Sequence, residues 1–162
     1  MENLNLKLGV KSDPIEYRYS YRWLFRIMAE EDVADLQLGT FFEIYQLPDE
    51  WFKSLRKDAE DFGVKISSVF TAHRELGGFF RCEPGWRGVA KKNYRRLIEA
   101  GAMLGAKRIG SNPGAALRDY LGLLPKGNEA FFEDMRGELA ETARSLGVEW
   151  LIERVCIRCE FG

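Results

Sequence analysis

Four polar residues stand near the ends of apolar runs and are the candidates for chemistry: Glu43, His73, Asn112 and Glu153. His73 is the only histidine of the chain. One histidine and one or two carboxylates, each from the end of a different strand, are the makings of a site for a hard or borderline metal. Taken singly, each residue also has an ordinary interpretation. Glu43 and His73 are typical of loop side chains, Asn112 beside Pro113 is typical of a turn, and Glu153 could be a helix cap or a surface charge. Their spacing forms no local motif, so only the fold could bring them together.

A repeat in the sequence indicates how the fold would do so. Gly63, Gly105 and Gly147 follow one another at the same interval of 42 residues, each between an amphipathic segment and a short apolar run. A glycine in that place is typical of the residue just after a helix. A helix, a glycine and a strand repeated in phase predict successive βα units that feed a parallel sheet. The carboxyl ends of parallel strands share one edge, where the four candidates would gather.

The sequence predicts an α/β protein of five strands and four helices. Strands are predicted at 6–10, 33–38, 106–110 and 148–152, with another starting at 64, and helices at about 20–30, 48–62, 87–104 and 128–146. Two architectures fit this series. A doubly wound open sheet of five strands closes at this length. A (β/α)8 barrel needs about 250 residues, so the chain would supply its first half plus one strand. Length alone favours the open sheet.

Composition narrows the class of protein. Residues 1–162 form a single domain in size, and 24 basic against 25 acidic side chains leave a formal net charge of −1. A nucleic-acid-binding domain is usually strongly basic, so no nucleic-acid partner is expected. No apolar run approaches the roughly 18–20 residues of a membrane span, and the start lacks the build of a signal peptide. Three cysteines make no disulfide framework. We expect a cytoplasmic protein without a membrane partner.

Four blocks of the sequence resemble one family. They are residues 7–14, 37–39, 67–80 (SSVFTAHRELGGFF) and 110–114, of which 67–80 is the most specific. Together they resemble bacterial sugar phosphate isomerase/epimerase proteins, which belong to the superfamily of xylose-isomerase-like barrels. The resemblance runs from residue 5 to about 153. It implies a metal-centred (β/α)8 TIM barrel that acts on small sugars or sugar phosphates, truncated here to its first five strands.

The resemblance also implies roles for the four candidates. Glu153 matches a glutamate at the end of strand five that binds the metal and transfers a proton, and His73 matches a residue that contacts substrate. Asn112 stands where the DNA-repair branch of the superfamily has a metal-binding histidine. We expect Asn112 and Glu43, from the loops after the fourth and the second strand, to bind substrate. The implied chemistry is proton abstraction beside a sugar carbonyl, with a divalent metal (Mn, Mg, Co or Zn) holding the enediolate oxygens.

The same resemblance leaves the metal site of this chain incomplete. The family's other ligands, an aspartate, a histidine and a glutamate, stand on later strands, and segment 154–162 departs from the family's pattern. Cys156 and Cys159 have CxxC spacing without a second pair or a following helix, so they indicate neither zinc nor redox chemistry. We interpret the chain as an inactive fragment, truncated or altered in reading frame after Glu153. Its first and fifth strands would be unpaired edges that invite self-association.

Two other functions stay open at this point. One is a metal-dependent phosphodiesterase of the AP-endonuclease type, whose binding to damaged DNA would weaken steeply with salt. The near-neutral charge and Asn112 both speak against it. The other is a non-catalytic α/β module that binds a small molecule or a partner, which would be a monomer without metal affinity.

Overall fold

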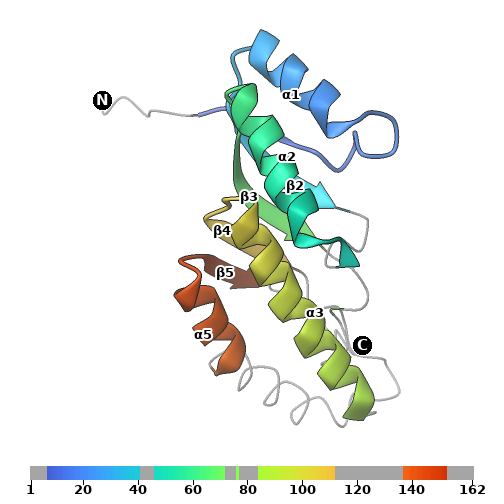
Figure 1. Ribbon diagram of the computed structural model, residues 1–162, viewed down its shortest axis with the longest axis vertical. Helices are drawn as coiled ribbons and strands as arrows, with labels where there is room; N and C mark the ends of the chain where they lie inside the picture. The colour runs from blue at the N-terminus through green and yellow to red at the C-terminus, as the bar shows by residue number, and fades with distance from the viewer. Residues whose placement is uncertain (1–6, 41–45, 72–75, 77–83, 112–136, 153–162) are drawn as a thin grey trace, which may run out of the picture.

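The computed structural model describes residues 7–40, 46–71, 76, 84–111 and 137–152 (Figure 1). Along the chain they form β1 (Gly9–Lys11), α1 (Tyr21–Glu30), β2 (Asp35–Thr40), α2 (Asp49–Asp61), β3 (Lys65–Thr71), α3 (Pro84–Met103), β4 (Arg108–Ser111), α5 (Glu138–Ser145) and β5 (Glu149–Ile152). This alternation confirms the predicted series, although the start of the predicted helix 128–146 lies outside the described residues. Within the described parts of the chain, no helix has the length and apolarity required to span a membrane.

The five strands form one parallel sheet in the order β1-β2-β3-β4-β5. A doubly wound sheet reverses its strand order at one point, and this sheet has no reversal. The alternative of an open doubly wound sheet is therefore wrong, although length favoured it. Right-handed crossovers that always lead to the next strand place their helices on one face. Figure 1 shows α1, α2, α3 and α5 on the same side of the sheet, which is the arrangement of a barrel wall.

The repeated glycines end three of the helices, as predicted. Gly63, Gly105 and Gly147 have φ of 71°, 80° and 66°, in the left-handed region that a glycine enters without steric cost. The residue after each glycine donates its N–H to a carbonyl oxygen of the last helical turn: Val64 to Ala59, Ala106 to Gly101 and Val148 to Ala143, at 2.9–3.0 Å. These bonds satisfy carbonyls that a helix end leaves open. They also turn the chain directly into the next strand.

A fourth copy of this turn carries no glycine and escaped the sequence analysis. Asp32 follows α1 with φ of 55°, and Val33 donates its N–H to the Met28 carbonyl oxygen at 2.8 Å. Aspartate is one of the few side chains that tolerate this conformation. All four described helices therefore end by the same device.

The core lies between the sheet and its helices. Alternate residues of the strands point to the helices, and Leu36, Leu38, Val69 and Ile109 are each no more than 1% exposed. The helices contribute the facing apolar side chains: Leu24, Phe25 and Met28 from α1, Phe52, Leu55 and Ala59 from α2, Ala90, Leu97 and Ile98 from α3, and Leu139 and Ala143 from α5. The opposite face of the sheet is covered by none of the described helices.

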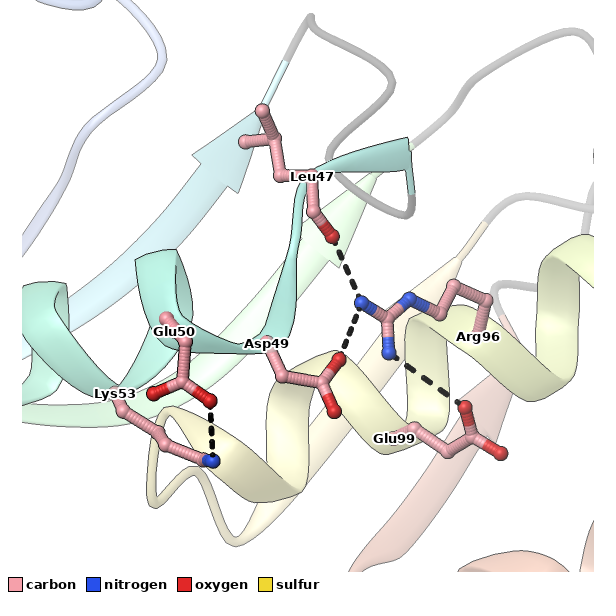
Figure 2. Close-up of polar contacts among 6 residues, drawn as sticks. All are labelled: Leu47, Asp49, Glu50, Lys53, Arg96 and Glu99. Atoms are coloured by element: carbon pink, nitrogen blue, oxygen red, sulfur yellow. Dashed lines mark hydrogen bonds and ion pairs between the residues drawn. The ribbon is translucent and has the colours of Figure 1, made fainter.

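Arg96 of α3 holds the beginning of α2, as Figure 2 shows. Its Nη2 donates to the Leu47 carbonyl oxygen at 2.8 Å and lies 2.7 Å from Asp49 Oδ1. The guanidinium also stands over the Phe52 ring, 5.3 Å from its centroid. Leu47 follows the loop that leaves β2, so this cluster fixes the far end of that loop against α3.

Tyr94 of α3 supports the carboxyl end of β4 from beneath. Its side chain is fully buried, and its hydroxyl accepts a hydrogen bond from Ser111 Oγ at 3.1 Å. The Trp150 ring of β5 packs against it with 5.3 Å between centroids. Burial raises the pKa of Tyr94, because the phenolate would have to leave water. In the sequence, Tyr94 recurs with Ala90, Leu97 and Ile98 at the spacing of one helix face, which indicates burial, but this spacing gives no sign of the bond to Ser111.

A pair of glycines within α3 tests the packing of this helix. A Cβ at Gly101 would stand 2.5 Å from Ile109 Cδ1, whereas a Cβ at Gly88 would meet nothing within 4 Å. We expect Gly101→Ala to lower the free energy of unfolding by about 1–3 kcal/mol through overpacking. The control Gly88→Ala should raise it by up to about 1 kcal/mol, since alanine favours the helix. Urea denaturation of both variants measures this, and equal effects would contradict the packing of α3 on β4.

A pH series tests the burial of Tyr94. Because its folded-state pKa is raised, the unfolded chain releases the phenolic proton first, and stability falls as pH rises past the unfolded value of about 10. Tyr94→Phe should cost about 1 kcal/mol at neutral pH, since Ser111 loses its partner. Above about pH 10 the difference from the wild type should shrink. Urea denaturation at several pH values measures it, with the 67% exposed Tyr17 changed to Phe as control. A difference that does not depend on pH would contradict a buried phenol.

Candidate functional site

The carboxyl ends of four strands stand side by side in register. Thr40 of β2 pairs with Thr71 of β3, Thr71 with Ser111 of β4, and Ser111 with Ile152 of β5. The segments that follow these strands therefore all begin at the same edge of the sheet. In α/β folds of this kind, that edge is where binding and catalytic residues gather.

The four predicted site residues follow this row in the sequence but lie outside the described residues. Asn112 comes directly after Ser111, Glu153 directly after Ile152, and His73 two positions after Thr71. Glu43 stands between Thr40 and the segment held by Arg96. The structure thus describes the strand ends that precede the candidates, and it does not test the candidates' own positions.

The sheet face opposite the helices carries a row of polar side chains that the sequence analysis did not assign to a site. One residue comes from each strand, and the register aligns them: Lys11, Gln37, Ser68, Arg108 and Glu149. Gln37 Nε2 donates to Ser68 Oγ at 3.2 Å, and Arg108 Nε donates to Glu149 Oε2 at 3.2 Å. The sequence signal was the polar residue at every second place of β2, which distinguishes the two faces of a strand.

A bulge in β3 sets which of its side chains join this face. The register shifts between Leu36 and Gln37 of β2, so that Ile66 pairs with the first and Ser68 with the second. Ser67 is the extra residue, and its Oγ donates to the Leu36 carbonyl oxygen at 3.1 Å. A bulge of this kind re-aims the residues that follow it. As a result Val69 faces the core, and Phe70 lies toward the open face.

A hollow of about 340 Å³ lies on this face next to the carboxyl edge. It is lined by Gln37, Ser67, Ser68, Val69, Phe70, Arg108, Gly110 and Leu151. The Phe70 ring packs directly against Gly110, because a Cβ there would come within 2.8 Å of Phe70 Cδ2. An aromatic wall beside amide, hydroxyl and guanidinium groups is a surface that a small polar ligand can contact.

A second hollow, of about 370 Å³, lies at the opposite edge of the sheet. It is lined by the turns that follow the helices, including Gly105 and Gly147, and by Arg56 and Lys107. In barrel folds the binding and catalytic residues come from the loops at the carboxyl edge, and residues at the opposite edge serve stability. We therefore take the hollow beside Phe70 as the candidate site.

The described residues do not by themselves hold a metal ion. Among residues 7–40, 46–71, 76, 84–111 and 137–152, no group of three or more His, Cys, Asp or Glu side chains comes together. A bound divalent cation needs at least three or four protein ligands or several carboxylates and waters. The predicted ligand Glu153 lies outside these residues, so the metal site stays a prediction.

Comparison with known proteins identifies the fold. Neither a protein-family model nor a curated protein matches the sequence. D-psicose 3-epimerase from Clostridium cellulolyticum, solved with D-tagatose, matches with a TM-score of 0.72 and 19% identity, over 93% of this chain and 53% of that chain. 3-Keto-D-glucoside 4-epimerase from E. coli matches with a TM-score of 0.69 and 15% identity, over 93% of this chain and 56% of that chain. A sugar phosphate isomerase/epimerase from Parabacteroides distasonis matches with a TM-score of 0.57 and 16% identity, over 90% of this chain and 50% of that chain.

This chain spans about half the length of the solved structures that it matches. At identities this low the likeness is one of fold. It agrees with the sequential strand order and with helices on a single face. The described part of the chain thus has the fold of the first half of a (β/α)8 TIM barrel, of the kind found in xylose-isomerase-like and sugar isomerase/epimerase proteins.

Proposed function

We propose that this chain is part of a sugar isomerase or epimerase and binds its sugar at the carboxyl edge of the sheet. The observation that carries the proposal is the aligned row of strand ends, Thr40, Thr71, Ser111 and Ile152. The adjoining hollow beside Phe70 offers polar and aromatic groups to a small polyol. The fold likeness to sugar epimerases supports the substrate class, and D-tagatose is the probe that one of those structures contains.

In this proposal the four predicted residues act from the loops at that edge. Glu153 removes the proton from the carbon beside the sugar carbonyl, while His73, Asn112 and Glu43 hold the sugar's oxygens. Return of the proton to the neighbouring carbon would isomerise the sugar. Return to the opposite face would epimerise it, which usually needs a second base, and none was found in the sequence.

A divalent metal, when bound, would supply Lewis-acid stabilisation of the sugar oxygen that gains negative charge. Glu153 is the one ligand that the family resemblance assigns to this chain, and one carboxylate is too few donors for a stable site. We therefore propose that the 162-residue chain binds sugar without completing the reaction. The cytoplasmic location and the lack of a nucleic-acid partner stay predictions from composition.

Sugar binding and sugar conversion are measured separately, because the chain is proposed to do the first without the second. The purified chain should show saturable binding of D-tagatose by ligand-observed NMR, and His73→Ala should weaken it because one contact with the sugar is lost. With added Mn²⁺ or Co²⁺, product analysis should find no conversion. Absence of any sugar binding would contradict the proposed function. Robust conversion would contradict the incomplete site, and in that case Glu153→Gln should abolish the activity.

The outer edges of β1 and β5 support a further part of the proposal, which is self-association. Within the described residues neither edge has a partner strand. Unpaired N–H and C=O groups on an edge strand favour pairing with another chain. Leu151, on the open face of β5, is 43% exposed and adds apolar surface beside that edge.

Light scattering tests whether these edges associate. We expect the wild-type chain to exceed the 18.6 kDa of a monomer in solution. Leu151→Lys should shift it toward the monomer, because a lysine on an edge strand opposes pairing. Leu146→Lys is a matched control, since Leu146 is also 43% exposed but lies after α5, away from the strand edge. A monomeric wild type, or equal effects of the two changes, would contradict pairing through β5.

A further inference from the structure

The end of β1 is fastened to β2 by a single buried serine. Ser12 is fully buried, and its Oγ donates to the Gly39 carbonyl oxygen at 2.8 Å while accepting the Gly39 N–H at 3.0 Å. The Ser12 N–H also donates to the Gln37 carbonyl oxygen at 3.1 Å. These bonds fix the residue that follows, Asp13, at the carboxyl edge of the sheet.

The Asp13 carboxylate lies directly over Gly39 and is only half satisfied. Its Oδ2 stands 2.5 Å from Lys11 Nζ. Its Oδ1 is buried and receives no hydrogen bond from the described residues. Gly39 makes room for it, since a Cβ there would overlap the carboxylate. A buried acceptor without a donor is costly, and native proteins rarely keep one without a ligand, a water or a function to account for it.

The surroundings of Asp13 indicate what kind of donor would complete it. The Lys11 ammonium at Oδ2 already supplies one positive charge, so a metal ion beside Oδ1 would be repelled. A neutral hydroxyl meets no such repulsion. Lys11 Nζ also lies 5.4 Å from the centre of the Phe70 ring, which borders the hollow on the open face. An acceptor and a donor side by side, next to an aromatic ring, match two neighbouring hydroxyl groups of a polyol.

We propose that Asp13 and Lys11 form a hydroxyl-binding subsite for a polyhydroxylated ligand, in which Asp13 Oδ1 accepts one hydroxyl hydrogen and Lys11 donates to the adjacent oxygen. This subsite rests on the proposed sugar function and adds two residues that the sequence analysis did not assign. Lys11 is about half exposed at its side chain and Asp13 is 21% exposed, so the pair lies near the surface of the edge, with Oδ1 on its buried side.

Titration of the full chain with D-tagatose, followed through backbone amide NMR shifts, tests the subsite. We expect the amides of Lys11 and Gly39 to move in a saturable way. Asp13→Asn should weaken the affinity about tenfold, the usual loss for a hydrogen bond to a charged group. Asp35→Asn is the matched control, because Asp35 carries the same charge at the amino end of the adjacent strand β2. It should leave the affinity unchanged.

The outcomes separate the subsite from the proposed function. Shifts at Thr71 and Ser111 without shifts at Lys11 and Gly39 would overturn the subsite and leave the sugar function standing. If no amide of the chain shifts, both the subsite and the sugar function are overturned. If Asp13→Asn fails to fold, Lys11→Met decides the matter. A similar loss of affinity in that variant supports the subsite, and an unchanged affinity overturns it.

Discussion

Parallel pairing of each strand with the next strand along the chain decides the arrangement of everything else in this molecule. It sends every described helix to one face, where Leu36, Val69 and Ile109 form the core. It also leaves the other face to a polar row and aligns the strand ends at one edge. The repeated left-handed turn makes this order possible, because each helix must reverse the chain in a few residues. A single geometric rule thus separates the apolar face, which gives stability, from the polar face and the edge that the predicted site residues follow.

Local signals in the sequence were enough to predict the elements. Gly63, Gly105 and Gly147 marked the helix ends because a left-handed residue favours glycine. The same signal failed at Asp32, where aspartate takes that conformation. The architecture was harder to predict than the elements. The length of the chain could be compared only with the lengths of complete open sheets and complete barrels. The choice between open sheet and barrel depends on strand order, and that order is a property of long-range pairing.

The open face could be predicted only in part. The alternation in β2 separated Gln37 from its apolar neighbours, but the bulge at Ser67 shifts the pattern of β3 and has no clear mark in the sequence. The Asp13 pair was likewise beyond prediction, because the contact with Gly39 joins segments that are distant in the chain. Glu43, His73, Asn112 and Glu153 stay predictions, supported by the aligned strand ends that precede them.

We propose that a sugar binds at the carboxyl edge of a half-barrel whose helices cover one face. A crystal structure of the chain with D-tagatose tests this most directly. We expect the sugar at that edge, beside Phe70 and within hydrogen-bond reach of Asp13 and Lys11. A sugar seated instead in the hollow at the opposite edge, beside Arg56 and Gly105, would contradict it.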